Sequence, residues 1–329
     1  MSCSSLILVT RYIVIAVGAQ IYKLIFQLMK QTYSYPVQFL FLMGLLGVFM
    51  IVGTFFLSIV GSQLLDCKFL EVAVQLNLPA NAGLSKILNL AATLIAFVFP
   101  AIIFTRVNKK ESQTTIEALG FSRIAGPKLL LYTAFITFGG ILLSGALAEI
   151  NQHINLPARL LEQAKALEQT YKTLMLNMAR MDSVLDYVTA LFVMALAPAI
   201  FEEILFRSTM QPLLIGWTKN VWVGIIITSV LFSAIHFSFF GFLSRTALGI
   251  VLGLLFYQTK NIWLSILMHF LNNGLIVTQL YIVTLQGKSL EKAMDENYFS
   301  ILSGLNGLMI LWFSFNALKK YNATLVKPL

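Results

Sequence analysis

Long apolar runs are the feature that most constrains how this chain can fold. A helix needs about 20 predominantly apolar residues to cross the hydrocarbon core of a bilayer. Runs of this kind lie at roughly 37–60, 87–105, 129–149, 187–211, 221–240, 242–258, 262–284 and 299–318. They predict an all-α fold, a polytopic transmembrane helix bundle of about eight spans.

The composition excludes the other broad classes of protein. Hydrophobic residues make up 58% of the 329 residues and charged residues 11%, whereas about a quarter of an average soluble domain is charged. So few charges cannot cover the surface of a single soluble globule, and the mean hydropathy of +0.82 excludes disorder. The two cysteines, Cys3 and Cys67, cannot form a disulfide framework and belong to no Cys/His metal-binding spacing.

Two segments outside the apolar runs have their own character. Residues 151–182 alternate leucines with Gln, Lys and Glu in a helical period, which predicts an amphipathic helix outside the bilayer or along its surface. In residues 1–28, Arg11 and Lys23 interrupt the apolar sequence, so this stretch is neither a clean signal peptide nor a clear span. Either Met29 is the natural start or the stretch is an amphipathic N-terminal helix.

The basic residues sort to one side of the predicted bundle. With eight spans both termini lie on the same side of the membrane, and we assign that side to the cytoplasm by the positive-inside rule. The segments on that side contain Glu111 and Glu117 as their acids and the following bases: Arg11, Lys23, Lys30, Arg106, Lys109, Lys110, Arg123, Lys128, Lys219, Lys260, Lys319, Lys320 and Lys327. The formal net charge of +9 therefore indicates topology, and no nucleic-acid partner is expected.

Few charges remain at the depth of the membrane. Arg245 lies near an end of the sixth run, where its side chain is expected to reach the interface. Glu202, Glu203 and Arg207 lie inside the fourth run, and ionisable groups at that depth face the interior of the bundle and mark function by default. Glu203 and Arg207 have the spacing of a helical ion pair. The side chain of Glu202 points about 100° away from them, so we assign Glu202 a catalytic role. A purely structural Glu-Glu-Arg cluster would have the same spacing.

Two histidines also fall within apolar runs. His236 ends the sequence Phe232-Ser-Ala-Ile-His236, and His269 begins His269-Phe-Leu-Asn-Asn273. His269 and Asn273 share a helix face, whereas Asn272 is expected to point elsewhere. His153, in a polar segment, is expected to be solvated. A single buried histidine is usually structural, but two of them with an Asn and a Glu-Glu-Arg cluster on separate helices favour a site.

Together these motifs resemble a known family. Glu-Glu-x-x-x-Arg, Phe-x-x-x-His and His-x-x-x-Asn, in this order on consecutive apolar helices, look like the motifs of the CPBP intramembrane proteases. This family includes the type II CAAX prenyl endopeptidases and bacteriocin-processing and immunity proteins. The resemblance implies a CPBP-like catalytic core over 187–284. It leaves an N-terminal extension (1–36), N-terminal spans with the amphipathic segment (37–186), and a last span with a cytoplasmic tail (285–329).

The resemblance implies hydrolysis of a peptide bond in a membrane-associated protein or peptide. Glu202 and His236 would hold and activate water, with Glu202 as the general base, and His269 and Asn273 would stabilise the oxyanion. Glu203 and Arg207 would support the site. The family has also been labelled as metalloproteases, and Glu202, His236 and His269 could ligate zinc. We favour the metal-free enzyme with no cofactor, because a ligating Glu202 would leave only the paired Glu203 as base.

Other functions remain open at this point. A proton-coupled transporter also buries Glu, His and Arg within a bundle, and a scaffold or bacteriocin-immunity protein could keep the fold without catalysis. The expected partners are the lipid bilayer and a membrane-bound peptide or lipidated protein substrate. Short loops and modest size favour a bacterial inner membrane. Finally, Gly249 and Gly253 are spaced for close packing of helices inside the bundle.

Overall fold

The computed structural model describes residues 33–110, 112–121, 125–295 and 299–325, and all regular elements in these ranges are helical. The prediction about residues 1–28 lies outside them. Seven segments are long and apolar enough to cross a membrane: Tyr35–Leu64, Pro79–Asn108, Pro127–Gln152, Val184–Thr218, Phe242–Thr259, Ile262–Leu285 and Ile301–Ala323. The predicted all-α, polytopic bundle is therefore confirmed.

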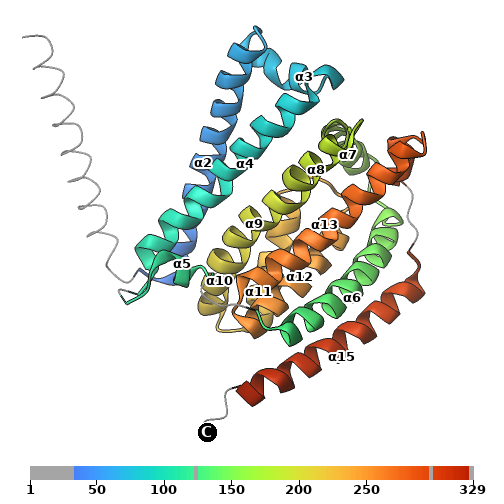
Figure 1. Cartoon of the computed structure of the whole chain (residues 1–329). Helices are drawn as coiled ribbons and strands as arrows, with labels where there is room; N and C mark the ends of the chain where they lie inside the picture. The colour runs from blue at the N-terminus through green and yellow to red at the C-terminus, as the bar shows by residue number, and fades with distance from the viewer. Residues whose placement is uncertain (1–32, 111, 122–124, 296–298, 326–329) are drawn as a thin grey trace, which may run out of the picture.

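The bundle has a central group of helices with a pair on each side (Figure 1). One pair is α2 (Tyr35–Leu64) with α4 (Ala82–Asn108), and the other is α6 (Pro127–Gln152) with α15 (Ile301–Leu325). The central elements are α8 (Val184–Ala190), η3 (Leu191–Leu196), α9 (Ala197–Glu203), η4 (Ile204–Met210), α10 (Gln211–Thr218), α11 (Val221–Ala234), α12 (Phe242–Thr259) and α13 (Ile262–Leu285). The start of α2 and the end of α15 lie at the same end of the bundle, called the lower end below (Figure 1).

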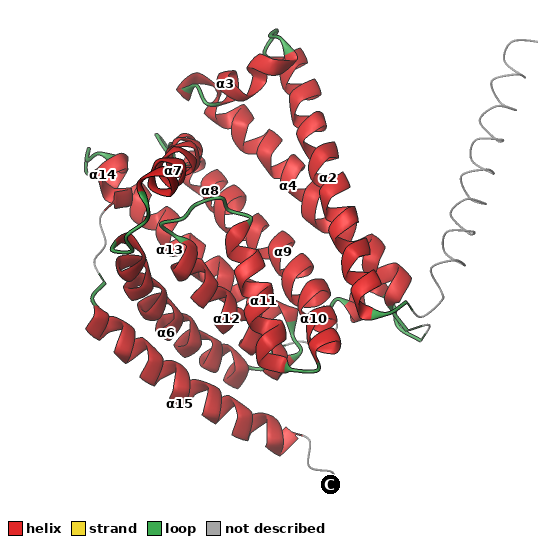
Figure 2. Ribbon diagram, turned by 180° about the vertical axis from the view of Figure 1, so that it is seen from behind, coloured by secondary structure: helices red, strands yellow, loops and turns green. Residues whose placement is uncertain are grey.

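Short elements occupy the two ends of the bundle. The upper end carries η1 (Phe69–Glu71), α3 (Val72–Leu76), η2 (Pro79–Asn81), α7 (Ala158–Met178) and α14 (Leu290–Asp295), and the lower end carries α5 (Thr115–Ala118). The predicted amphipathic helix is α7, which lies across the upper end (Figure 2). His153, just before it, is exposed as expected.

The helix that bears the two glutamates contains two π-helical segments. η3 and η4 flank α9, and each ends just before a proline, Pro198 or Pro212. Proline has no N–H for the usual bond to the carbonyl four residues earlier. A local π register is one way for a helix to continue past such a gap, and it is frequent at functional sites.

The fifth predicted span is shorter than expected. α11 ends at Ala234 rather than near residue 240 and has 14 residues, or about 21 Å at 1.5 Å per residue. The chain then turns, with Phe237 at a φ of +49°. Asn151 at the end of α6 stabilises this turn, because its side-chain amide donates to the carbonyl of Phe239 (2.9 Å) and its oxygen accepts from the amide of Leu243 (2.8 Å). Irregular backbone is tolerated at such depth where protein buries it.

Candidate active site

The three charged residues of the fourth span are buried together. Glu203 and Arg207 have no exposed surface and Glu202 is 8% exposed. The predicted ion pair is present, with Arg207 Nε 3.2 Å from Glu203 Oε2. The guanidinium of Arg207 also lies 4.7 Å from the centre of the Phe232 ring, and its Nη2 donates to the carbonyl of Gly249 at 3.4 Å. Arg207 thus joins η4 to α11 and α12.

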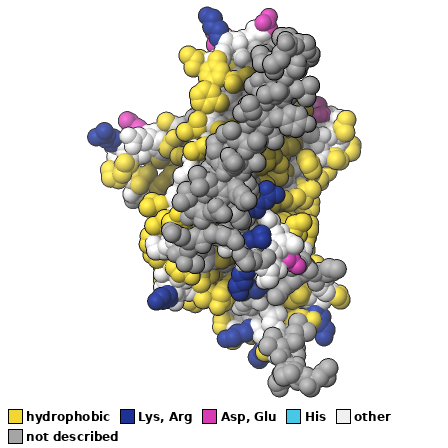
Figure 3. All heavy atoms as spheres, turned by 90° about the vertical axis from the view of Figure 1, so that its left-hand side faces the viewer, with side chains coloured by type: hydrophobic (Ala, Val, Ile, Leu, Met, Phe, Trp, Pro, Cys, Tyr) yellow, Lys and Arg dark blue, Asp and Glu magenta, His cyan; other side chains and the backbone are white. Residues whose placement is uncertain are grey.

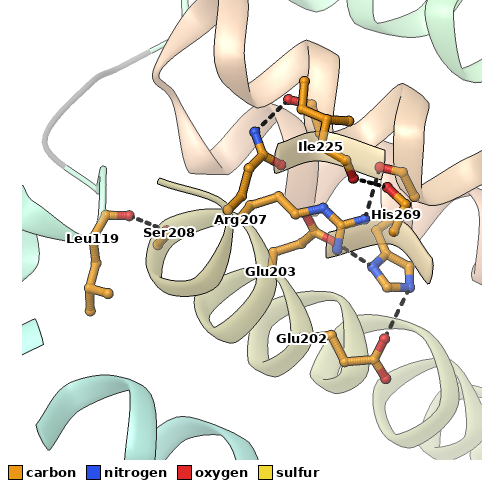
Figure 4. A network of polar contacts seen from close by, with 11 residues as sticks. Leu119, Glu202, Glu203, Arg207, Ser208, Ile225 and His269 are labelled. Carbon is orange, nitrogen blue, oxygen red and sulfur yellow. Dashed lines mark hydrogen bonds and ion pairs between the residues drawn. The ribbon is translucent and has the colours of Figure 1, made fainter. Parts of the chain in front are cut away.

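Both glutamates face the same histidine, His269 of α13 (Figure 4). Glu203 Oε1 lies 3.0 Å from His269 Nδ1, and Glu202 Oε2 lies 3.8 Å from Nε2. Because the carboxylate of Glu203 is a hydrogen-bond acceptor, Nδ1 carries the proton of this contact and Nε2 is the nitrogen turned toward Glu202. Glu202 Oε2 is buried and has no hydrogen-bond partner among the described residues.

His236 lies in the turn after α11, not on a helix as the apolar run suggested. Its Nδ1 contacts the carbonyl of Phe232 at 2.9 Å. A carbonyl can only accept, so Nδ1 is the donor and Nε2 is left as an acceptor. The Phe232 ring packs edge-on against both His236 and His269, at 5.3 and 5.8 Å between ring centres. The phenylalanine of the Phe-x-x-x-His motif therefore holds the two imidazoles in position.

Asn272 does not point away from the site as expected. Its amide donates to Oδ1 of Asn273 at 3.1 Å, and both side chains line the cavity that also contains His269. This bond occupies the side-chain oxygen of Asn273 and leaves the NH₂ group of Asn273 available as a donor. Asn272 is thus a residue that orients Asn273.

One cavity of about 400 Å³ brings the predicted catalytic residues together. Glu202, His236, His269 and Asn273 all line it, while Glu203 and Arg207 lie directly behind them. The rest of the wall is largely apolar, with Met175, Met178 and Met194 among its residues. A largely apolar cavity with a few convergent polar groups is typical of a ligand or active site.

Arg245 is a cavity residue that the sequence reasoning placed elsewhere. Instead of reaching the interface, it lines the same cavity, donates to the carbonyl of Ser238 (2.7 Å) and lies 5.5 Å from the ring centre of Tyr171. Glu168 of α7 accepts from the hydroxyl of Ser238 at 2.7 Å. The sequence did offer a signal, since Arg245 was one of the few charges without a place on either membrane side.

Tyr171 lines the cavity and comes from α7, which lies at the upper end of the bundle (Figure 1). Burial raises the pKa of the Tyr171 hydroxyl above its usual value, an effect that the positive charge of Arg245 opposes. The phenol is therefore neutral and offers the cavity a hydroxyl group. The amphipathic segment predicted to lie outside the bilayer or along its surface thus contributes to the wall of the site.

The alternative zinc ligands do not converge. Among the described residues, no three His, Cys, Asp or Glu side chains are close enough to hold a metal ion. Nδ1 of His269 is directed to Glu203 and Nδ1 of His236 to a backbone carbonyl, which leaves Nε2 of each ring open, as it also is in metal-bound histidines. Because Glu202, His236 and His269 do not form a group close enough to hold a metal ion in this arrangement, we assign no step to a metal.

Comparisons with known proteins agree with the motifs. Residues 184–275 match the family model described as type II CAAX prenyl endopeptidase Rce1-like, so the resemblance is confirmed for the segment that contains the site. A Bacillus subtilis (strain 168) protein named "Putative membrane peptidase YdiL" is 31% identical over 99 residues, which are 29% of this chain and 40% of that protein. The match thus spans less than half the length of this relative. No solved structure matches the chain.

The chain is an integral multi-pass membrane protein, as its seven apolar helices and the family match indicate. A bacterial inner membrane is consistent with the Bacillus relative. The matched segment is thus similar to segments of proteins described as a type II CAAX prenyl endopeptidase and as a putative membrane peptidase.

Proposed function

We propose that this protein is an intramembrane endopeptidase that uses Glu202 to activate water. The observation that carries the proposal is the position of the Glu202 carboxylate, which lies 3.8 Å from His269 Nε2 and lines the cavity that also contains His236 and Asn273. Hydrolysis of a peptide bond needs a base for water and donors for the oxyanion. The four side chains supply both.

In the first step, water attacks the scissile carbonyl and gives a proton to Glu202. His236 helps to hold this water, because its Nε2 is an acceptor once Nδ1 has donated to the carbonyl of Phe232. The carbonyl oxygen becomes an oxyanion, and the NH₂ group of Asn273 donates to it. Asn272 keeps that NH₂ group in place by its bond to Oδ1 of Asn273.

In the second step, the proton reaches the leaving amine. With Nδ1 directed to Glu203, His269 can donate from Nε2 only after the ring gains a second proton. Glu202 is the nearest acid, and the proton it took from water passes to Nε2 as the oxyanion develops. His269 then donates to the oxyanion. As the C–N bond breaks, the same proton moves to the amine, which restores the starting state.

The proposed substrate is a membrane-bound peptide or a lipidated protein, because the cavity lies within the bundle and its wall is largely apolar. No protein nucleophile is required. Cys67 lies near the turn between α2 and η1 at the upper end of the bundle, outside the residues that line the cavity.

Purified protein in detergent tests the proposal. It is incubated with a prenylated CAAX peptide and with an unprenylated single-span peptide, and products are identified by mass spectrometry. We expect Glu202→Gln to reduce cleavage by roughly 10²- to 10⁴-fold, the usual contribution of a general base. The matched control Glu162→Gln changes an exposed glutamate of α7 and should leave cleavage unchanged.

Two outcomes would overturn the assignment. Equal cleavage by wild type and a correctly folded Glu202→Gln variant would remove Glu202 from the reaction. If the wild type cleaves neither peptide, while Glu202→Gln abolishes a transport or immunity phenotype in cells, the transporter or immunity alternative would be favoured instead.

A further inference from the structure

A five-residue turn occurs twice at the lower end of the bundle. Thr218-Lys219-Asn220-Val221-Trp222 joins α10 to α11, and Thr259-Lys260-Asn261-Ile262-Trp263 joins α12 to α13. In both turns the Asn side chain accepts from the Trp backbone amide at 3.0 Å and begins the next helix. Each turn thus reverses the chain within two residues.

The lysine of each turn has a backbone conformation that favours glycine. Lys219 has a φ of +52° and Lys260 a φ of +50°, in the left-handed region that is common at helix C-termini but strained for long side chains. Strained residues persist where the surrounding structure enforces them, and they often have a function. Here the feature shared by the two strained positions is a positive charge.

The two lysines line the same cavity. A cavity of about 710 Å³ lies between the two turns and the end of α15, lined by Lys219, Lys260 and Lys319 with Trp222 and Tyr257. Lys260 Nζ lies 4.2 Å from the centre of the Tyr257 ring. Among the described lining residues three are lysines and none is acidic, so this described part of the wall carries positive charge.

The cavity lies where the surface of a membrane is expected. Trp217, Trp222 and Trp263 are 41%, 55% and 47% exposed at the lower ends of the central helices. Exposed tryptophans are enriched at the level of the lipid headgroups. Basic pockets between transmembrane helices on the cytoplasmic side are typical sites for anionic headgroups.

One further group in the wall distinguishes among headgroups. The side-chain oxygen of Gln258 is buried and has no hydrogen-bond partner among the described residues. Asn322 does not supply one, because its amide donates to the backbone carbonyl of Gln258 at 2.9 Å. When the Gln258 side chain turns toward the cavity, a headgroup with a hydroxyl donor would satisfy this buried oxygen, whereas a choline headgroup has no such donor.

We propose that this cavity binds an anionic phospholipid whose headgroup carries both a phosphate and a hydroxyl group, as in phosphatidylglycerol. The lysines bind the phosphate, Gln258 accepts from the glycerol hydroxyl, and Trp222 packs against the adjoining lipid. The site is separate from the cavity of Glu202 and does not depend on the proposed hydrolysis.

Native mass spectrometry tests the proposal by measuring lipid binding to the full chain. The protein is released from detergent in the presence of phosphatidylglycerol or phosphatidylcholine. The test variant combines Lys219→Gly, Lys260→Gly and Lys319→Gln, because glycine keeps the left-handed turns without strain. Each lysine near an anionic lipid surface contributes about fivefold to binding, so we expect roughly a hundredfold weaker binding of phosphatidylglycerol. Wild type should prefer phosphatidylglycerol to phosphatidylcholine.

A matched control removes the same charge from the same end of the bundle. This control variant combines Arg106→Gln, Lys109→Gln and Lys110→Gln, at and just after the end of α4. It should bind phosphatidylglycerol like wild type. Replacing Lys219, Lys260 and Lys319 with arginine should preserve binding, while Gln258→Met should reduce the preference for phosphatidylglycerol over phosphatidic acid, which lacks the glycerol hydroxyls.

Three results would overturn the proposal. The first is equal binding by the test variant and wild type, and the second is an equal loss in the control at the end of α4. The third is displacement of bound lipid by inorganic phosphate with the same affinity, which would identify a soluble phosphate as the ligand. The unfolding temperature in detergent shows whether each variant is folded.

Discussion

At the scale of single residues, Glu203 connects the parts of the site. Its two carboxylate oxygens have different partners, since Oε1 contacts His269 of α13 and Oε2 contacts Arg207 of η4. One buried carboxylate therefore sets the orientation of a proposed catalytic imidazole and compensates a buried cation. This explains why Glu203 is expected to support the reaction without being its base.

Arg207 should be essential for stability. Breaking a buried ion pair by removing one partner typically costs about 3–5 kcal/mol, because the remaining charge is buried without compensation. We expect Arg207→Met to lower the free energy of unfolding by about this amount, measured by thermal or denaturant unfolding in detergent. The double variant Glu203→Gln/Arg207→Met removes both charges of the pair and should recover much of the loss. A double variant as unstable as the single one would contradict this explanation.

Metal chelation should not affect hydrolysis. The candidate zinc ligands do not converge among the described residues, and the proposed mechanism uses Glu202 as the base and not as a ligand. We expect a strong chelator to leave cleavage of the test peptide unchanged, and metal analysis to find less than one equivalent of zinc in active protein. Loss of cleavage on chelation, with recovery on adding zinc, would assign a metal to the site.

Which residues the sequence could identify depends on their separation along the chain. The Glu203–Arg207 pair follows from helical geometry alone. The contacts of His269 with Glu202 and Glu203 join residues more than 60 positions apart, so they depend on how α9 and α13 are rotated about their axes. For the same reason the position of Arg245 in the cavity could not be predicted.

At the scale of elements, close packing of α12 against α11 and α10 supports the site. A Cβ added to Gly249 would lie 2.9 Å from Cβ of Ser229, and one added to Gly253 would lie 2.7 Å from Oε1 of Gln211. The prediction that these glycines serve packing inside the bundle is confirmed. Gly249 also presents the carbonyl that accepts from Arg207, so this packing affects the ion pair directly.

Gly249→Val should therefore destabilise the protein. Added atoms in a well-packed interface typically cost about 1–3 kcal/mol, and a shift of α12 would also weaken the contact with Arg207. We expect a lower unfolding temperature in detergent and reduced cleavage. The control Gly44→Val introduces the same side chain on α2, where nothing lies within 4 Å of the added Cβ. Equal effects of both variants would contradict the role of this contact.

The fifth apolar run shows the limits of hydropathy at this scale. The run continues to about residue 240, but α11 ends at Ala234 because the chain turns there and Asn151 satisfies the turn from another helix. Apolar side chains are equally compatible with a helix and with a buried turn. Only the long-range bonds of Asn151 distinguish the two.

At the scale of the whole molecule, charge separates the two ends of the bundle. Apolar side chains cover most of the visible described surface on the side of α2 and α4, and Lys and Arg side chains concentrate toward the lower end (Figure 3). The described chain begins and ends there (Figure 1). We propose that the lower end is cytoplasmic, as the positive-inside rule predicts.

Thiol labelling in intact cells tests this orientation. In a Cys3→Ser background, Cys67 at the upper end should react with a membrane-impermeant maleimide added from outside. In a Cys3→Ser/Cys67→Ser/Ser112→Cys variant, the new thiol replaces an exposed residue at the lower end and should react only after the cells are opened. The reverse pattern would place the lower end outside the cell.

The sequence by itself determined the class of the protein and the approximate spans, and it indicated four candidate catalytic residues, Glu202, His236, His269 and Asn273, among the larger set that lines the cavity. These features follow from hydropathy and from spacing along one helix, which are local properties. The tertiary structure decided which side chains meet. It directs both glutamates to His269 and brings Arg245 and α7 into the cavity wall. These outcomes depend on the rotation and packing of helices far apart in the chain, which no local pattern encodes.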